Sequence, residues 1–491
     1  MSASTERKNR AAARAAGTDK KMLAAQEAAE KARKSKRRWI IGTIAVVLCI
    51  ALVLFLSSPI MYRITTAVSV GGKNYSPAQF NYMRASSKNQ AILYGLDYST
   101  LSSYFGEEYA DELLDSYVNY SLTVNASKLQ AAQEQGISLS AMEKSAIQDN
   151  VDLQMSYIRQ YAKLSGTSVS TYMSYLFGAG VNANVIRKSM EEDALCNKTA
   201  FAKYCELSFS PEELAAYYAD PSDGDMFSYA YFLVTEDEEH PGDDLPFVAA
   251  DIADGFRDLW DGEVEAETLF TDLVGEIYPE QTPTVHNNVS GANLEESFHD
   301  WLTAEGRSKG DITSLEAPSG SGFYVLLFLD RTDNSEEVAA VRHILVKAVP
   351  SEDGGYTDEA KAEAKARAEE ILAAYEKGEK TEADFATMAS LLSEDSKTAA
   401  DGGLYSAVTK GEMVEEFDAF CFADHQYGDT AIVYGESGVY AGYHVMFYVE
   451  KLPARDASAR DALRSDAMNE WLTSLVGDLE PVQHWAYKLV G

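Results

Sequence analysis

The sequence predicts an α+β protein with a single N-terminal transmembrane helix, a mainly helical module and two related α+β domains. Three observations predict it: an uncharged apolar run near the N-terminus, long helical periodicity after that run, and an approximate repeat in the second half. The 491 residues are enough for three or four domains. The expected segments are 1–38, 39–58, 59–224, 225–335, 336–453 and 454–491.

The first 58 residues combine a basic tail with an apolar run. Residues 1–38 contain twelve Lys or Arg against four Asp or Glu, and residues 39–58 contain no charged side chain. With a rise of about 1.5 Å per residue, a helix of this length spans a bilayer core of roughly 30 Å. The positive-inside rule predicts a single-pass cell-membrane protein with a cytoplasmic N-terminus and an extracytoplasmic bulk. A cleaved signal peptide is the alternative, although no clear A-x-A site follows the run.

The overall charge and the few cysteines restrict the function classes. The formal net charge of −35, carried after the basic tail, argues against nucleic-acid binding because an acidic surface repels phosphate. No cysteine or histidine group has metal-ligand spacing, so we expect no metal and no cofactor. Cys196 and Cys205 could form a disulfide, or they could be small buried hydrophobic residues.

Residues 59–224 are expected to fold mainly as helices. Apolar residues recur at spacings of three and four, and Ser76-Pro77 has the composition of a helix start. The many tyrosines of this region predict either a helical core or an apolar groove for extended polypeptide segments. Residues 454–491 are predicted to form a C-terminal helix whose apolar face packs on this module.

Residues 225–335 and 336–453 are predicted to be two copies of one fold. Two pairs of segments are parallel in sequence: 227–234 with 339–346, and 310–331 with 428–451. Helical segments lie between the predicted strands, which indicates helices packed on an antiparallel sheet. The two copies are therefore expected to share their shape.

Two histidines distinguish the second copy from the first. His343 and His444 each lie in a short β-branched run, and the matching positions of the first copy are Tyr231 and Tyr324. If the two histidine strands are neighbours, the imidazoles face each other in one site. Any chemistry of the pair is then expected in the second copy only.

The second copy resembles the parvulin family of peptidyl-prolyl isomerases. Five motifs occur in order: RHILV with His343, S-x-D with Ser393 and Asp395, GGLY at 402–405, G-x-M-x-x-x-F with Met413 and Phe417, and G-x-H with His444. The whole plan is similar to the extracytoplasmic foldases of the SurA and PrsA type. The chain departs from the family where GGLY replaces GGDLG and where Ala441 replaces a frequent Ser or Thr.

The resemblance implies a peptidyl-prolyl cis-trans isomerase that assists the folding of exported proteins. Its partners would be unfolded or partly folded polypeptides that contain X-Pro bonds. Two sets of site residues follow from the motifs. The candidate catalytic residues are His343, Ser393, Asp395 and His444, and the candidate proline pocket is Leu404, Met413, Phe417 and Phe422. Rotation about the amide breaks no bond, so neither a nucleophile nor a metal is required.

Two other functions compete with the isomerase. In the first, the chain is a non-enzymatic holdase whose two parvulin-like domains only bind clients. In the second, it is a secretion-linked sensor that uses the cytoplasmic tail. A Ser/His/Asp hydrolase is disfavoured because Ser393 and Asp395 are two residues apart and no nucleophile-elbow glycines surround the serine.

Overall fold

The computed structural model divides the chain into two compact units. The structure describes residues 3–17, 20–56, 58–88, 97–218, 220–237, 240–318, 320–351 and 354–491. The first unit contains Met1–Thr123, Val151–Ser189 and Leu479–Gly491, and the second contains Val124–Asn150 and Met190–Asp478. The parvulin-like region and the end of the helical region therefore belong to the same unit.

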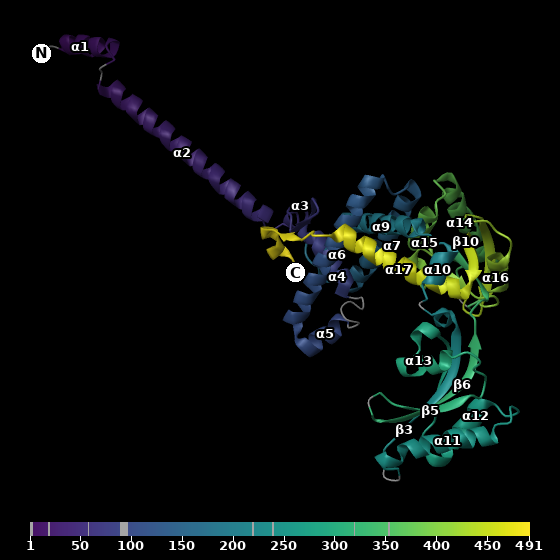
Figure 1. Ribbon diagram of the computed structural model, residues 1–491. Coiled ribbons are helices and arrows are strands. Elements are labelled where there is room, and N and C mark those ends of the chain that lie inside the picture. The colour runs from purple at the N-terminus through teal and green to yellow at the C-terminus, as the bar shows by residue number, and fades with distance from the viewer. Residues whose placement is uncertain are drawn as a thin grey trace. The chain divides into compact units, whose positions relative to one another are not determined.

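The N-terminal region of the first unit contains α1 (Ala3–Ala15) and the long helix α2 (Lys20–Leu56), visible in Figure 1. The span expected at residues 39–58 lies on α2, apart from its last two residues, of which 57 is outside the described residues. In the described part of the chain, no helix has both the length and the apolarity that crossing a membrane requires, and the expected span is unconfirmed.

A small antiparallel sheet joins the two ends of the first unit's globular part. Its strand order is β11-β1-β2, with β1 at Val68–Val70, β2 at Lys73–Tyr75 and β11 at Val482–Gln483. The helices of this unit are α3 (Met61–Ile64), α4 (Pro77–Lys88), α5 (Tyr98–Phe105) and α8 (Val169–Phe177), with the short 3-10 helix η5 (Trp485–Leu489). Three longer helices run from one unit into the other: α6 (Glu107–Gln135), α7 (Ala141–Leu164) and α9 (Ala183–Glu206).

The C-terminal segment differs from the single helix expected over residues 454–491. Helix α17 spans Ala454–Val476 and ends at Gly477, whose φ of 49° lies in the left-handed region. The helix packs against α10 (Pro211–Ala216), where Ala459 and Leu463 contact Leu214. The residues after Gly477 form β11 and η5 instead of a longer helix, because Pro481 cannot continue one.

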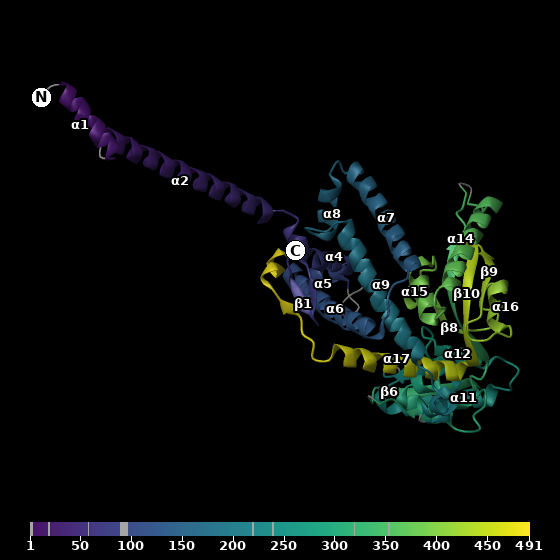
Figure 2. The same ribbon diagram turned by 90° about the horizontal axis from the view of Figure 1, so that it is seen from above.

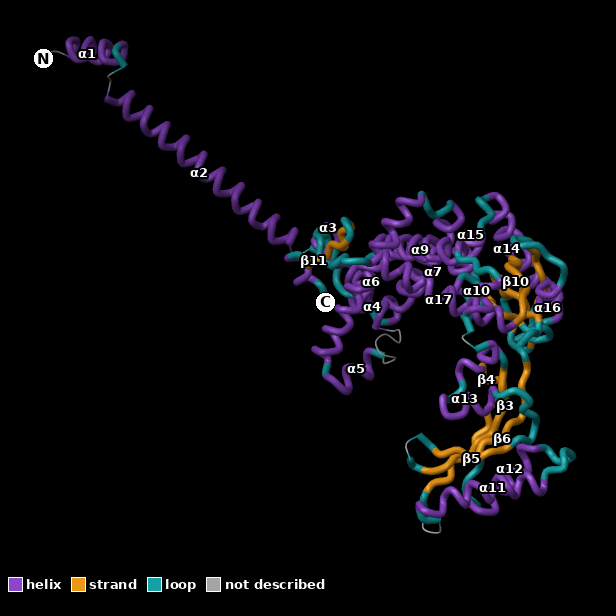
Figure 3. The backbone as a smooth tube through the Cα atoms, viewed as in Figure 1, coloured by secondary structure: helices purple, strands orange, loops and turns teal. Residues whose placement is uncertain are grey.

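The second unit contains two four-stranded antiparallel sheets with the same topology. The first has the order β4-β3-β6-β5 and the second the order β8-β7-β10-β9. Their strands are β3 (Met226–Thr235), β4 (Thr284–Ser290), β5 (Ile312–Glu316), β6 (Gly322–Thr332), β7 (Glu337–Lys347), β8 (Leu404–Val408), β9 (Thr430–Ser437) and β10 (Tyr440–Pro453). Figure 3 shows these strands in orange. Each sheet thus repeats the order of the other, strand by strand.

Helices cover both faces of each sheet. In the first domain, α11 (Leu245–Leu259) and α12 (Ala266–Ile277) pack on one face, and α13 (Glu296–Thr303) packs on the other (Figure 1). In the second, α14 (Asp358–Lys377) and α15 (Glu382–Leu392) lie opposite α16 (Glu415–Phe422), as Figure 2 shows for α14 and α16. Burial of these apolar faces stabilises each domain by roughly 25 cal/mol per Å² removed from water.

The alternation of side chains along β7 decides which face carries each residue. Ala340, Ile344 and Val346 pack with α14 and α15, whereas Ala339 and Val341 pack with α16. Odd-numbered positions of β7 therefore point toward α16, and His343 is one of them.

All four cysteines are free thiols. Cys196 is buried and Cys205 is partly buried, and no disulfide joins them. Of the two alternatives for this pair, a disulfide or two small buried side chains, the structure has the second. The Cys196 thiol donates to the Asn125 carbonyl, with 3.5 Å between Sγ and the oxygen.

Candidate active site

The two histidines face each other between neighbouring strands. In the antiparallel pairing of β7 and β10, His343 lies opposite Met446 and His444 lies opposite Leu345. Their Nδ1 atoms are 2.9 Å apart and the rings stack with centroids 5.1 Å apart. Only 2% of His343 and 4% of His444 is exposed. The expected pairing of the imidazoles is present, in a place with little access for water.

The hydrogen bonds around the pair assign its protons. Asp395 Oδ2 lies 2.9 Å from His343 Nε2, and because a carboxylate only accepts, Nε2 carries a hydrogen. In the form in which His343 is neutral, its Nδ1 accepts and His444 Nδ1 is the donor between the rings. His444 Nε2 must in turn accept, and the Tyr440 hydroxyl donates to it over 3.0 Å. One continuous relay runs from Tyr440 through both imidazoles to Asp395.

The electrostatics agree with a neutral His444 beside an ionised carboxylate. Burial, reinforced by the nearby His343, lowers the pKa of His444 to about 3. The hydrogen bond from His343, with further bonds from Thr398 and the Lys397 amide, holds the pKa of Asp395 far below its usual range. Within the described ranges, no group of three or more His, Cys, Asp or Glu side chains could hold a metal ion.

Thr398 and Tyr405 complete the surroundings of Asp395. The Thr398 hydroxyl donates to Asp395 Oδ2 over 2.8 Å and lies 3.0 Å from His343 Nε2, which places it to receive part of that hydrogen bond. The Tyr405 hydroxyl is 3.4 Å from the same carboxylate oxygen. Burial, aided by Asp395, raises the pKa of Tyr405 to about 12, so the phenol stays a donor.

Ser393 holds the loop that carries Asp395. Its hydroxyl accepts hydrogen bonds from the Leu345 amide at 3.1 Å and from the Asp395 amide at 3.3 Å. These bonds tie the end of α15 to β7, next to His343. The structure therefore gives Ser393 a positioning geometry, and the residue that contacts the imidazole directly is Asp395.

The glycine pair of the GGLY motif lets the chain pass close behind His343. The Gly403 carbonyl accepts from the His343 amide at 2.8 Å, and Gly403 has a φ of 71°. A Cβ atom at this position would lie 2.1 Å from the His343 carbonyl oxygen. Only glycine fits there, because any side chain would push β8 away from β7.

Three of the four residues expected in the proline pocket lie together on the α16 face. The Phe417 ring meets both imidazoles edge to face, at 5.5 Å from His343 and 5.2 Å from His444. Met413 and Phe422 are partly buried in the same apolar cluster. Phe417 is thus the aromatic wall directly against the histidine pair.

The placement of Leu404 in this pocket is wrong. Leu404 pairs with Arg342 across β7 and β8, and cross-strand partners share a face of the sheet. Arg342 is on the face opposite His343, so Leu404 points away from the histidines. Tyr405 takes the expected position, with its ring 5.3 Å from His343 and 6.0 Å from Phe417. The residue of β8 that faces the histidines is thus one position later than predicted.

Sequence reasoning missed Thr398, Tyr405 and Tyr440. Two of them had a local signal: Tyr440 lies four residues before His444 on the same strand, which puts both side chains on one face. Thr398 lies three residues after Asp395, within reach of its carboxylate. Tyr405 required the strand register, which the motif alone did not supply.

The first domain repeats this geometry with the residue types exchanged. Tyr231 lies opposite Leu326 and Tyr324 opposite Leu233, the same register that His343 and His444 have in the second domain. The two tyrosine rings are 5.6 Å apart, and Phe298 of α13 is 4.9 Å from Tyr324. An aromatic cluster therefore replaces the histidine pair.

A comparison with protein families matches the second domain. Residues 324–446 match the model described as the PPIC-type PPIase domain. This segment is a PPIC-type PPIase domain. It contains every candidate site residue, and the resemblance to the parvulin isomerases is confirmed for this part of the chain. The match also includes most of β6, which precedes the predicted start of the domain at residue 336.

One curated relative of the chain is the Chaperone SurA of Alcanivorax borkumensis. It is 34% identical over 103 residues, which cover 20% of this chain and 21% of the relative. The chain thus matches about a fifth of that relative's length.

Solved structures of PrsA also resemble the chain. The peptidylprolyl isomerase PrsA of Bacillus anthracis is 12% identical with a TM-score of 0.18, covering 58% of this chain and 92% of the other. PrsA of Bacillus subtilis is 13% identical with a TM-score of 0.19, covering 78% and 86%. Both the identities and the TM-scores are low.

Proposed function

We propose that the PPIC-type domain isomerises X-Pro peptide bonds and that the chain assists the folding of exported polypeptides. One observation carries the proposal: the buried relay of Tyr440, His444, His343 and Asp395 lies directly against Phe417. The site thus combines an apolar aromatic side chain with a set of polar side chains whose positions are fixed by hydrogen bonds.

The chemistry of the reaction suits such a site. The planar amide resists rotation by about 18–20 kcal/mol because resonance gives the C–N bond double-bond character. The resonance also places negative charge on the carbonyl oxygen, and a dry site with a fixed carboxylate disfavours that charge. The twisted amide has less charge on this oxygen and is bound better. Each difference of about 1.4 kcal/mol between the twisted and planar states accelerates the reaction tenfold.

The test is the isomerisation of a chromogenic proline tetrapeptide by the full chain. We expect the double variant His343→Ala/His444→Ala to lower kcat/KM by at least about tenfold, a loss of about 1.4 kcal/mol in transition-state binding. The matched control is Tyr231→Ala/Tyr324→Ala, which alters the same two strand positions of the first domain and should keep the activity. Circular dichroism checks that both variants fold.

Full activity in a folded double-histidine variant would remove these residues from the reaction. A wild-type chain that does not accelerate the tetrapeptide would instead favour the holdase alternative. The observation behind that alternative is the first domain, which keeps the topology and register but carries tyrosines in place of the histidines. A holdase would suppress the aggregation of a denatured protein equally well with and without His343 and His444.

We also propose that residues 39–58 anchor the chain in the cell membrane, with the N-terminus cytoplasmic and the remainder extracytoplasmic. The support is the uncharged run, the basic tail before it and the exposure of apolar side chains along α2, such as Trp39, Ile41 and Leu48. Alkaline carbonate should leave the full chain in the membrane fraction. Its release into the supernatant would contradict the anchor, and a mature protein that begins after residue 58 would indicate a cleaved signal peptide.

A further inference from the structure

Arg342, the residue directly before His343, lies on the opposite face of the same sheet and is only 1% exposed. A buried guanidinium is costly unless acceptors surround its N–H groups. Here Nε donates to Glu382 Oε1 at 2.7 Å, and Nη1 donates to the carbonyls of Asp401 at 2.8 Å and Gly402 at 3.1 Å. The arginine thus joins the start of α15 to the turn that precedes β8.

The turn held in this way belongs to the same segment as the hydrogen-bond partners of His343. The Thr398 carbonyl accepts from the amides of Asp401 and Gly403, at 3.0 and 2.8 Å. The Thr398 hydroxyl in turn donates to Asp395, whose carboxylate is the partner of His343 Nε2. A displacement of the turn would therefore move the groups that orient the imidazole.

The turn approaches the guanidinium closely because it contains glycine. Gly402 has a φ of 67°, in the left-handed region, and a Cβ atom there would lie 2.9 Å from Arg342 Nη1. The neighbouring Gly403 carbonyl accepts from the His343 amide. Two successive residues of β7 thus bind the same turn, Arg342 through its side chain and His343 through its main chain.

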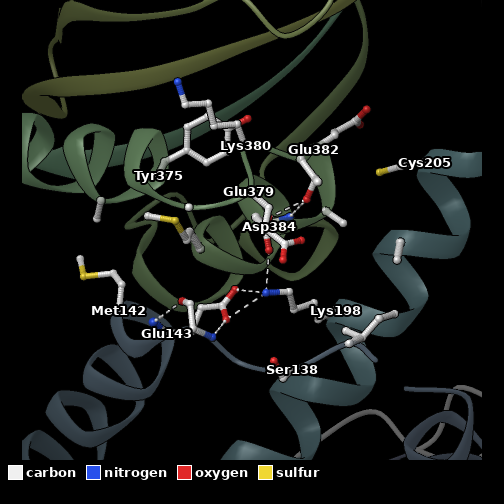
Figure 4. Close-up of a pocket in the computed structure, with 18 of the residues that line it drawn as sticks. Ser138, Met142, Glu143, Lys198, Cys205, Tyr375, Glu379, Lys380, Glu382 and Asp384 are labelled. Carbon is white, nitrogen blue, oxygen red and sulfur yellow. Dashed lines mark hydrogen bonds and ion pairs between the residues drawn. The ribbon is translucent and has the colours of Figure 1, made fainter. Parts of the chain in front are cut away.

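Glu382, the ionic partner of Arg342, is itself fixed. Its other carboxylate oxygen accepts from the Tyr427 hydroxyl at 3.0 Å. It shares the first turn of α15 with Asp384, whose Oδ1 lies 2.6 Å from Lys198 Nζ of α9 (Figure 4). The carboxylate therefore orients the arginine from a helix end that is held at two further points.

Two aromatic rings of α9 also contact the guanidinium. Its Cζ atom lies 5.8 Å from the ring centroid of Phe201 and 5.7 Å from that of Tyr204. A cation over an aromatic face is attracted by the ring, and more strongly where water is excluded. The orientation of Arg342 is thus set by α9, by α15 and by the turn before β8 together.

The first domain, which has no histidine pair, also lacks this ion pair. Ala230 precedes the first tyrosine of its aromatic cluster, as Arg342 precedes the first histidine. Ala266 is the first residue of α12, as Glu382 is the first residue of the corresponding helix α15. Both alanines are buried in an apolar core. The topology therefore forms without the pair, and a buried ion pair is in general weak evidence for stability.

We propose that Arg342 is a positioning residue of the isomerase site: it fixes the turn at 401–403 and thereby holds Asp395 and Thr398 against His343. The inference rests on the proposed isomerase function and adds to it a residue on the other face of the sheet. Arg342 acts only through the turn, because its side chain points away from the histidines. A misplacement of about 1 Å in a catalytic site can cost roughly a hundredfold in rate.

The experiment compares the full chain with its double variant Arg342→Met/Glu382→Gln. Methionine keeps a long side chain without donors, and glutamine removes the carboxylate charge that would otherwise be buried without a partner. We expect kcat for the proline tetrapeptide to fall about tenfold or more with little change in KM, since the lost interaction serves the transition state. The ¹⁵N resonance of His343 Nε2 should shift, because its acceptors have moved.

The matched control is Arg331→Met/Asp225→Asn in the first domain. Arg331 Nε donates to Asp225 Oδ2 at 2.7 Å and Nη1 donates to the Thr303 carbonyl at 3.1 Å, so the control removes the same kinds of bonds. It should keep the wild-type kcat and the wild-type His343 resonance. Urea unfolding shows which variants are folded under the assay conditions.

A second variant, Arg342→Lys, decides the question if the double variant does not fold. Lysine keeps the positive charge beside Glu382, but its single ammonium lacks the planar fork that bonds the carboxylate and the turn together. We expect a smaller loss of kcat and a shift of the His343 resonance.

A folded Arg342 variant with the wild-type kcat would overturn the proposal. A lower kcat with an unchanged His343 resonance would also overturn it, because the arginine would then act by another route than the turn. An equal loss in the control would assign the effect to general destabilisation. A wild-type chain without isomerase activity would instead remove the proposed function, and the resonance of His343 would still show whether Arg342 holds its acceptors in place.

Discussion

At the scale of single residues, the histidine pair depends on hydroxyl groups that hold its protons in one arrangement. Tyr440 donates to His444, and Thr398 donates to the carboxylate that receives the His343 hydrogen. Ala441, which replaces a frequent Ser or Thr of the family, is fully buried and has no hydroxyl. The Tyr440 phenol supplies a hydroxyl one residue earlier in the chain.

The variant Tyr440→Phe tests this role. It removes the donor to His444 Nε2, and a buried acceptor without its partner costs about 1–3 kcal/mol of stability. We expect urea unfolding to report this loss and ¹⁵N NMR to show a changed Nε2 resonance of His444. Tyr443→Phe, which removes a hydroxyl on the opposite face of β10, is the control. An unchanged His444 spectrum in Tyr440→Phe would contradict the assigned relay.

The depressed pKa of His444 makes stability depend on pH. The pKa is about 3 in the folded chain against 6.5 ordinarily, so between these values the unfolded state binds the additional proton. Stability must then fall as the pH is lowered through this window, by at most about 1.4 kcal/mol per pH unit from this group. The lowered pKa of Asp395 acts in the same direction at lower pH.

Urea unfolding of the wild type and of His444→Gln between pH 7 and about pH 4.5 measures this effect, because glutamine cannot titrate. We expect the stability of the wild type to fall more steeply with acidification than that of the variant. Parallel curves for the two proteins would show that His444 is not held neutral by the fold.

At the scale of elements, the close passage of β8 behind β7 positions both the Asp395 loop and Tyr405. Gly403 is the contact point, because its carbonyl accepts from His343 and its missing side chain leaves room for the strand. The bulge between Ala339 and Val341 belongs to the same strand pairing. A change at this contact should therefore affect the site without altering any of its side chains.

Gly403→Ala should destabilise the domain by clearly more than the strain of a left-handed alanine, which is about 1–2 kcal/mol. Gly411→Ala is a sharp control: its φ of 86° is equally restrictive, but nothing lies within 4 Å of the added Cβ. Urea unfolding separates the steric clash from the backbone strain. Equal losses in the two variants would mean that the close approach at Gly403 has no cost of its own.

At the scale of the whole molecule, the last residues of the chain complete the first unit. His484 donates its amide to the Ala67 carbonyl at 2.8 Å, and the Tyr487 ring meets Phe80 edge to face at 5.3 Å. The Tyr487 hydroxyl donates to Asp115 over 3.0 Å. Residues more than three hundred positions apart therefore stabilise one sheet and its helices.

Truncation after Asp478 should loosen this unit and leave the PPIC-type domain intact. We expect faster amide hydrogen exchange in β1 and β2, because the truncated chain lacks the third strand. The proline tetrapeptide assay should give the wild-type rate. Tyr487→Phe, which keeps the ring and removes only the hydroxyl, should change exchange much less. Unchanged protection of residues 68–75 after truncation would contradict the role of β11.

The sequence by itself determined the repeat, the helical region and the partnership of His343 with His444. These features depend on local periodicity and on motifs whose spacing the chain preserves, and the glycine pair at 402–403 belongs with them. Phe417 also followed from its motif, because the helix after the loop brings it to the histidine face.

Only the tertiary structure decided the register of β8, which places Tyr405 instead of Leu404 beside the histidines. It likewise decided that Tyr440 and Thr398 lie within hydrogen-bond distance of the histidine pair. It also decided that the chain after Gly477 forms a strand. The physical reason is the same in each case. A one-residue shift reverses the face of every side chain in a strand, and contacts between distant segments depend on packing that local sequence does not encode.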